Sequence, residues 1–303
     1  MRLAALVFAL LTLAAGAGDA PAAATLRVVT TTTDLKALTE AVGGAVVEVE
    51  SLTRGTQNVH DVELRPSLML KLRRADVLVE NGLELDAWID VAARGASNAK
   101  ILAGGRGRID ASRDVPVIDV PAGRVDRSHG DVHPQGNPHF SLDPGLAPLV
   151  TQTILEGLAR VAPAHQAVFA KNRDAFLARL ADALAQWTRR MEPFKGAKVV
   201  SYHADFNYFL RRFGLVPLAN LEDRPGIPPS PGHLARLIQQ MKQERVKVVL
   251  LEPWSDRGLA ERVAGDAGAR AIVLATGVGA VTGAETYLGA LEYNVRALTE
   301  ALR

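Results

Sequence analysis

The chain has 303 residues, of which 48% are hydrophobic and 22% are charged, and its formal net charge is +2. This composition is that of a folded globular protein, and it excludes a disordered or fibrous chain. Because the net charge is small and the arginines are scattered without a basic stripe, we expect no nucleic-acid partner.

The first 24 residues have the pattern of a signal peptide. One basic residue, Arg2, precedes an apolar run from Leu3 to Ala15, and small residues follow at Ala15–Ala17 and Ala22–Ala24. The run is shorter than the about 20 apolar residues that a membrane span needs, although an N-terminal anchor is the alternative. We expect a periplasmic protein that does not insert into the membrane once residues 1–24 are removed. The chain has no cysteine, so we expect neither disulfides nor a thiol-linked lipid anchor.

From residue 25 to residue 161, β-rich runs alternate with helical stretches. In chain order, the pattern predicts strands Leu26–Thr32 and Val46–Leu52, a helix Pro66–Ala75, a strand Asp76–Glu80, weaker strands Ile101–Leu102 and Val117–Val120, a polar surface loop Ala122–Asn137 and a helix Asp143–Val161. Strands that alternate with helices are typical of parallel βαβ units. We therefore predict an N-terminal α/β lobe over residues 25–161.

A long helix follows this lobe. Between Pro163 and Met191 there is no glycine and no internal proline, and apolar residues recur on one helical face. A helix of this length spans roughly 43 Å. We predict that residues 162–194 form a rigid linker between two lobes, although the periodicity alone equally allows a long helix within one domain.

Beyond the linker the alternating pattern restarts. It predicts, in chain order, a strand Lys198–Tyr202, a helix Phe206–Phe213, a strand Leu215–Leu221, a helix Pro231–Gln243, a strand Val246–Glu252, a helix Leu259–Ala267, a strand Ala271–Ala275 and a helix Glu285–Leu302. We predict a C-terminal α/β lobe over residues 195–303. The expected fold class is therefore α/β, with two lobes of mostly parallel sheet flanked by helices and joined by one long rigid helix.

Three histidines, His60, His139 and His203, lie where loops meet predicted strand ends or helix starts. Because open α/β sheets bind ligands outside the carboxyl ends of their strands, folding could bring the three together. Three neutral imidazoles at one point favour zinc or a similar transition metal. A lone histidine is more often an ordinary hydrogen-bonded residue, and these sequence separations match no local zinc motif. From residues alone, the metal site stays a hypothesis.

The segments around these histidines are NVHDVELRPS, with RPSLMLKLRRADVLVENGLELDAWI continuing it, NPHFSLDP and YHADFNYFLRRFGL. They resemble the metal-binding family of substrate-binding proteins that serve ABC importers of zinc and manganese. The resemblance runs from Leu26 to Arg303 and includes the long helix. It implies that His60 and His139 of the first lobe and His203 of the second bind a metal between the lobes. It also implies a carrier rather than an enzyme, with an ABC transporter membrane permease as partner. We expect the protein to be a monomer.

The resemblance also bears on the metal and on its fourth ligand. Manganese carriers of the family tend to have a carboxylate where this chain has His203, so we expect Zn²⁺ as the transported ligand, with Mn²⁺ less favoured and copper or nickel still open. The family usually supplies an aspartate after the last strand of the second lobe, but this chain has Ala275, Thr276 and Gly277 there. The fourth ligand is then a water, Glu252 or a carboxylate from elsewhere.

Alternatives stay open at this point. Three histidines with an open fourth position could also form an exported zinc-dependent hydrolase, or the ligand could be organic. His129 and His133 lie in the polar loop, where zinc carriers of the family often have a histidine-rich segment. Two histidines favour a plain solvated loop. The proline-rich segment Asp223–Leu234 should be a stiff loop beside the cleft, touching the transporter or closing over the metal.

Overall fold

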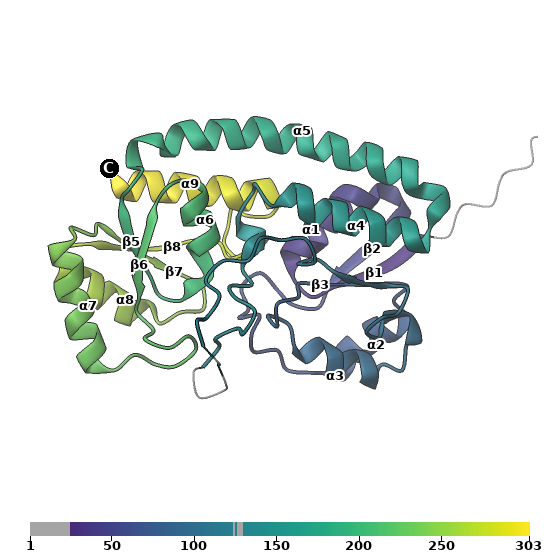
Figure 1. Cartoon of the computed structure of the whole chain (residues 1–303), viewed down its shortest axis with the longest axis horizontal. Coiled ribbons are helices and arrows are strands. Elements are labelled where there is room, and N and C mark those ends of the chain that lie inside the picture. Colours follow the sequence, from purple (N-terminus) through teal and green to yellow (C-terminus); the bar gives the residue numbers. More distant parts are fainter. Residues whose placement is uncertain (1–24, 124, 126–129) are drawn as a thin grey trace, which may run out of the picture.

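The computed structural model describes residues 25–123, 125 and 130–303. The predicted signal peptide, residues 1–24, and His129 lie outside the described residues. The chain forms two α/β lobes side by side, and one long helix, α5, runs along the top of both (Figure 1). The predicted fold class is confirmed.

The N-terminal lobe is built on a four-stranded parallel sheet in the order β2-β1-β3-β4. Its strands are β1 (Leu26–Thr30), β2 (Val47–Ser51), β3 (Val77–Glu80) and β4 (Arg108–Asp110). Its helices are α1 (Thr33–Gly43), α2 (Pro66–Arg74), α3 (Trp88–Gly95) and α4 (Ala147–Val161), with 3₁₀ turns η1 (Gly44–Val46), η2 (Ala99–Ile101) and η4 (Phe140–Leu142). Four-residue strands as apolar as β3 suit a sheet that is covered on both faces.

The C-terminal lobe repeats this arrangement, with a parallel sheet in the order β6-β5-β7-β8. Its strands are β5 (Lys198–Ser201), β6 (Val216–Asn220), β7 (Val248–Leu251) and β8 (Arg270–Val273). Its helices are α6 (Asn207–Arg212), α7 (Pro231–Gln243), α8 (Arg257–Ala267) and α9 (Tyr287–Leu302), with the 3₁₀ turn η7 (Ala204–Phe206).

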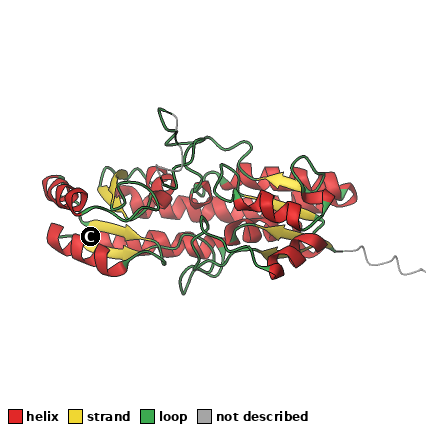
Figure 2. Cartoon of the chain, turned by 90° about the horizontal axis from the view of Figure 1, so that it is seen from below, coloured by secondary structure: helices red, strands yellow, loops and turns green. Residues whose placement is uncertain are grey.

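In both lobes the first strand lies between the second and the third, so the chain crosses over it after the second strand. Such a switch point leaves a crevice outside the carboxyl ends of the strands, and ligands of open α/β sheets bind there. The loops of the two lobes come together in the middle of the molecule (Figure 2). The topology therefore directs the loops that follow β2 and β5 toward a common region.

The long helix, α5, spans Gln166–Met191 and is flanked by the 3₁₀ turns η5 (Pro163–His165) and η6 (Glu192–Phe194). It buries one face, formed by Phe169, Phe176, Leu180, Trp187 and Met191, and packs on α1, α4 and α9.

The core beneath α5 is continuous between the lobes. It contains Val28 of β1, Val199 of β5 and Leu291 of α9. The lobes are therefore joined by shared packing as well as by the helix, and the residue boundaries of the lobes stay a prediction.

Two weak strand predictions are wrong. Val117–Val120 has no strand structure, because Asp119 adopts a φ of 53°, which extended backbone does not allow. Ile101–Leu102 falls at the end of η2. The fourth strand is instead β4, which the sequence did not reveal. This three-residue strand pairs with β3 and buries Ile109 in the core, and the 7% exposed Arg108 side chain forms an ion pair with Glu80 on β3.

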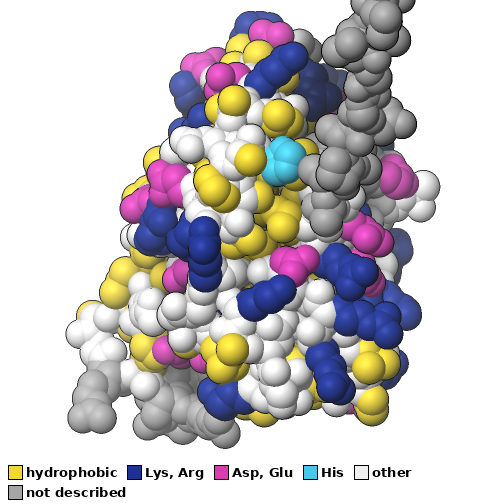
Figure 3. Space-filling model, turned by 90° about the vertical axis from the view of Figure 1, so that its right-hand side faces the viewer, with side chains coloured by type: hydrophobic (Ala, Val, Ile, Leu, Met, Phe, Trp, Pro, Cys, Tyr) yellow, Lys and Arg dark blue, Asp and Glu magenta, His cyan; other side chains and the backbone are white. Residues whose placement is uncertain are grey.

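The surface shows mixed charge. On the end face seen in Figure 3, Lys and Arg side chains lie among acidic and apolar ones. Several basic residues of the N-terminal lobe pair with carboxylates, such as Lys71 with Glu50 and Lys100 with Asp76, both at 2.7 Å. Within the described part of the chain, no helix combines the length and the apolar character that crossing a bilayer requires.

Asp34, in the first turn of α1, connects the two lobes. Its buried carboxylate accepts hydrogen bonds of 2.8 Å from the backbone N–H of Val278, in the C-terminal lobe, and from Ser141 Oγ. Burial raises the pKa of Asp34 to about 6, even though the hydrogen bonds from Ser141 and Val278 act to lower it. The charged form of this side chain is therefore held at a cost in stability near neutral pH.

We expect Asp34→Asn to remove this cost. The folded pKa of about 6 lies above the usual aspartate value of 3.8, so the stability that a protonated Asp34 contributes is lost as the pH rises through about 6. A shift of this size corresponds to about 3 kcal/mol. An asparagine can still accept from Val278 and donate to Ser141. In urea unfolding between pH 4 and 8, the free energy of unfolding should decline less with rising pH for the variant than for the wild type. At pH 7.5 the variant should be the more stable of the two. A less stable variant at pH 7.5 would contradict this interpretation.

Candidate metal centre

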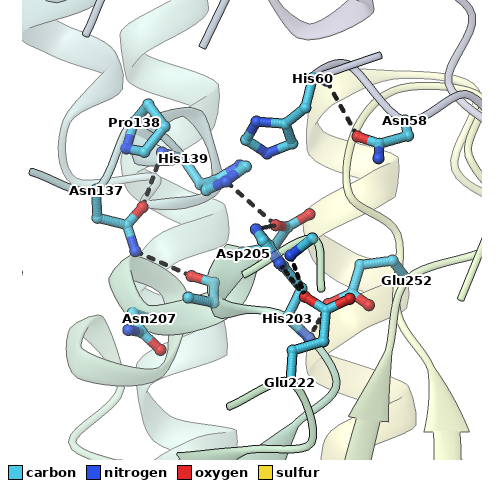
Figure 4. A network of polar contacts seen from close by, with 12 residues as sticks. Asn58, His60, Asn137, Pro138, His139, His203, Asp205, Asn207, Glu222 and Glu252 are labelled. Carbon is cyan, nitrogen blue, oxygen red and sulfur yellow. Dashed lines mark hydrogen bonds and ion pairs between the residues drawn. The ribbon is translucent and has the colours of Figure 1, made fainter. Parts of the chain in front are cut away.

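The three histidines predicted from the sequence meet between the lobes (Figure 4). The ring centroids are 5.2 Å apart for His60 and His139, 5.3 Å for His60 and His203, and 5.9 Å for His139 and His203. One donor atom from each ring and one carboxylate oxygen of Asp205 all lie within 4.8 Å of one another. Donor atoms this close can reach one ion at bond lengths of about 2.0–2.2 Å with small side-chain adjustments.

His60 is placed by the loop that follows β2. Its backbone N–H donates to Asn58 Oδ1 at 3.0 Å, and the indole N–H of Trp88 donates to the carbonyl of Val59 at 3.2 Å. The loop also lies against the C-terminal lobe, because a Cβ built on Gly55 would be only 2.3 Å from the carbonyl oxygen of Val278. The loop that carries His60 is therefore held by both lobes.

His139 is the residue directly before η4, and Asn137 fixes it. The amide oxygen of Asn137 accepts from the His139 N–H at 3.0 Å, and its amide nitrogen donates to the carbonyl of Ala204 at 2.9 Å. Ala204 belongs to the turn that carries the third histidine, so one asparagine side chain sets the position of His139 relative to the other lobe.

His203 follows β5 directly before η7, at the carboxyl end of the strand, as the sequence predicted. Its backbone N–H donates to Glu252 Oε1 at 3.2 Å. Its ring nitrogen Nδ1 lies 2.7 Å from Glu222 Oε2. This contact leaves the other ring nitrogen, Nε2, on the side of His139 and Asp205.

Asp205 is the site residue that the sequence analysis did not single out. Its side chain is 2% exposed, and its Oδ1 lies 3.2 Å from Nε2 of His139 and 3.6 Å from Nε2 of His203. Asp205 Oδ1 and His60 Nε2 are both buried and find no hydrogen-bond partner among the residues that the structure describes. The available signal was a carboxylate two residues after His203, the only charged side chain in the aromatic-rich segment ADFNYF.

The other expected sources of a fourth donor are occupied differently. The Glu252 carboxylate accepts from the His203 N–H and from Ser255 Oγ, and it supports the His203 loop without joining the four-residue group. At Ala275, where the family usually has its aspartate nearby, the backbone N–H and carbonyl are both bound by the Asn294 side chain, at 2.7 and 2.8 Å. The backbone at Ala275 is therefore held by Asn294.

His133 does not lie in a plain solvated loop, so that expectation is wrong for it. Its ring is stacked on that of His60 with centroids 5.1 Å apart, and its Nε2 is buried with no hydrogen-bond partner in the described part of the chain. Burial lowers the pKa of His133 to about 4, with a further contribution from the nearby His203. A neutral imidazole therefore borders the group.

The protonation of the three histidines differs with their surroundings. Burial lowers the pKa of His60 and of His139 well below the usual value, and the neighbouring histidines lower them further. Burial also acts to lower the pKa of His203, but the Glu222 hydrogen bond and the charges of Asp205 and Glu252 raise it to about 9. Burial raises the pKa of Asp205. The carboxylates therefore favour positive charge at this point of the cleft.

Comparison with known proteins identifies the family. A family model described as "Zinc-uptake complex component A periplasmic" matches residues 28–301. The chain belongs to this family. The family works with ABC import permeases, and its members are metal-binding transport proteins of the periplasm or lipoproteins.

Individual relatives are distant. The chain is 25% identical over 285 residues to the zinc-binding lipoprotein AdcA of Streptococcus pneumoniae, a match that covers 91% of this chain and 55% of that protein. It is 24% identical over 256 residues to the high-affinity zinc uptake system protein ZnuA of Bacillus subtilis, covering 83% and 78%. The iron-binding protein YfeA of Yersinia pestis is 26% identical over 253 residues, covering 80% and 75%. The chain thus spans about half the length of the pneumococcal relative.

Solved structures share the fold. A crystal structure of ZnuA superimposes with a TM-score of 0.79 at 22% identity, covering 92% of this chain and all of that one. A structure of the laminin-binding adhesin of Streptococcus agalactiae gives a TM-score of 0.77 at 25% identity, with the same coverage.

Gly55 offers a test of how the His60 loop is held. A methyl group there would lie 2.3 Å from Val278 O and 2.5 Å from Ala280 N, both main-chain atoms. We therefore expect Gly55→Ala to displace the loop and to weaken zinc binding about tenfold or more, equivalent to about 1.4 kcal/mol. Competition with a chromophoric chelator measures this affinity. Gly123→Ala, where a Cβ meets nothing within 4 Å, is the matched control, and equal affinities in the two variants would contradict the expectation.

Proposed function

We propose that this protein is a carrier that binds one divalent transition metal, zinc first, through His60, His139, His203 and Asp205. The observation that carries the proposal is the Asp205 carboxylate, which is buried among three imidazoles with an oxygen that has no hydrogen-bond partner in the described chain. A buried carboxylate is strongly destabilised unless it is paired or coordinates a metal. A cation at this point gives the carboxylate that partner.

The donor types support zinc over manganese. Three imidazole nitrogens and one carboxylate oxygen match the four-coordinate zinc sites of proteins. Manganese lies lowest in the divalent affinity series and suits oxygen-rich sites. Copper and nickel bind nitrogen donors at least as tightly as zinc does. The proposal is therefore that the site takes zinc where zinc is the available ion.

The closed donor set supports a carrier over a hydrolase. A catalytic zinc site keeps a position open for water beside three protein ligands, whereas Asp205 fills that position here. Two carboxylates beside His203, Glu222 and Glu252, are held by His203 and by backbone or serine donors.

Delivery to an ABC import permease from the periplasm is the remaining part of the proposal. It is supported by the family to which residues 28–301 belong and by the signal-like pattern of residues 1–24. Because the lobes share one continuous core, we propose that metal binding causes modest local closure of loops rather than a wide swing of the lobes, and that the monomer is the working form.

Replacement of single donors tests the site. We expect His60→Ala, His139→Ala and His203→Ala each to weaken zinc binding by at least about a hundredfold, or 2.7 kcal/mol, because each removes one coordinate bond. Asp205→Asn should weaken it less, since an amide oxygen remains but the charge is lost. His165→Gln, on η5 away from the site, should leave the affinity unchanged.

Isothermal titration of chelator-treated protein measures these affinities. Zinc at a hundredfold excess over the dissociation constant should also stabilise the wild type by about 2.7 kcal/mol. A wild type that binds no zinc, or a His203→Ala variant with wild-type affinity and an intact fold, would contradict the proposed function.

A further inference from the structure

Glu222 lies just beyond β6, and one of its oxygens makes two contacts that belong to different parts of the site. Oε2 is 2.7 Å from Nδ1 of His203 and accepts a 2.8 Å hydrogen bond from the backbone N–H of Gly226. The Glu222 side chain is 14% exposed. Its backbone N–H donates to the carbonyl of Tyr202 at 3.1 Å, which fixes the residue beside the end of β5.

The first contact decides which nitrogen of His203 is free. A neutral imidazole has one donor nitrogen and one acceptor nitrogen. Metal binding requires the neutral ring. In that form the Glu222 carboxylate accepts the proton of Nδ1, and the lone pair lies on Nε2, which is directed toward Asp205. A carboxylate in this position also raises the basicity of the coordinating nitrogen.

The second contact leads to the loop between β6 and α7, which contains the part of the proline-rich segment that precedes α7 at Pro231. Gly226 has a φ of 74°, and the adjoining carbonyl of Pro225 accepts a 2.8 Å hydrogen bond from the Asp131 N–H of the other lobe. A Cβ built on Gly226 would lie 2.1 Å from Asp131 Oδ2. The two loops are therefore packed closely against each other.

This loop contact lies at the mouth of the site. A cavity of about 480 Å³ is lined by His60, His203, Glu222, Asp131 and Gly226, among others. The same carboxylate oxygen therefore touches a metal-ligating ring and the loop that borders the opening above it.

We propose that Glu222 is a positioning residue that couples metal binding at His203 to the closure of the Gly226 loop against Asp131. The inference rests on the proposed function, since it requires a metal on His203 Nε2. A metal at that atom withdraws electron density from the ring and makes the Nδ1–H a stronger donor to Glu222. The carboxylate is then held more firmly, and with it the Gly226 N–H and the contact between the lobes.

The test combines zinc affinity with hydrogen–deuterium exchange of the full chain. In the wild type, saturating zinc should slow exchange in peptides that cover residues 222–230 and 130–137. Glu222→Ala should lower zinc affinity about 10- to 100-fold, and at saturating zinc it should lose the added protection of both peptides. Glu222→Gln keeps one acceptor oxygen, so its zinc affinity and its zinc-dependent protection should both lie between those of the wild type and of Glu222→Ala. Asp223→Asn removes a charge from the neighbouring residue, which is exposed and near His233, and should behave as the wild type.

The outcomes separate the two proposals. If zinc protects residues 222–230 and 130–137 as fully in Glu222→Ala as in the wild type, the coupling is wrong while the metal site stands. An equal loss of affinity in Asp223→Asn and Glu222→Ala would show that general charge, and not positioning, is responsible, and would also overturn the coupling. A wild type that binds no zinc overturns the proposed function and this inference with it.

Discussion

The Asp205 carboxylate, enclosed by three imidazoles, is the constraint on which the rest of the site depends. Its oxygen lies 3.2 Å from His139 Nε2 and is cut off from solvent. Burial raises the pKa of Asp205, so the charged carboxylate is costly here unless a positive charge lies beside it. With a cation, four donors from two lobes are satisfied at once. The loops around the site hold these four donors close together.

The fold maintains this arrangement through contacts between the lobes rather than through the long helix alone. Asn137 joins the His139 turn to Ala204, Asp34 joins α1 to Val278, and Gly55 allows the His60 loop to lie against main chain of the C-terminal lobe. Each of these contacts lies between segments far apart in the sequence. Together with a continuous core under α5, they hold the two lobes in contact on either side of the site.

The sequence predicted more of the fold than of the details of the site. Apolar periodicity identified the long helix and most strands, and loop positions at strand ends correctly suggested that His60, His139 and His203 converge. Asp205 was missed because an aspartate near the start of a turn is common as a cap, and only the folded turn shows that it points inward. His133 was expected in solvent because its loop is polar, but stacking on His60 depends on a contact 73 residues away. β4 was missed because it has only three residues, of which Ile109 alone is buried, so it gives no apolar pattern.

An anomalous difference map, collected at the zinc edge from crystals grown with zinc, tests the central claim most directly. The account predicts one strong peak between the lobes, at about 2.0–2.2 Å from nitrogens of His60, His139 and His203 and from an oxygen of Asp205. A peak bound by Glu252 in place of Asp205, a peak that lacks any of the three histidines, or no peak between the lobes would contradict it.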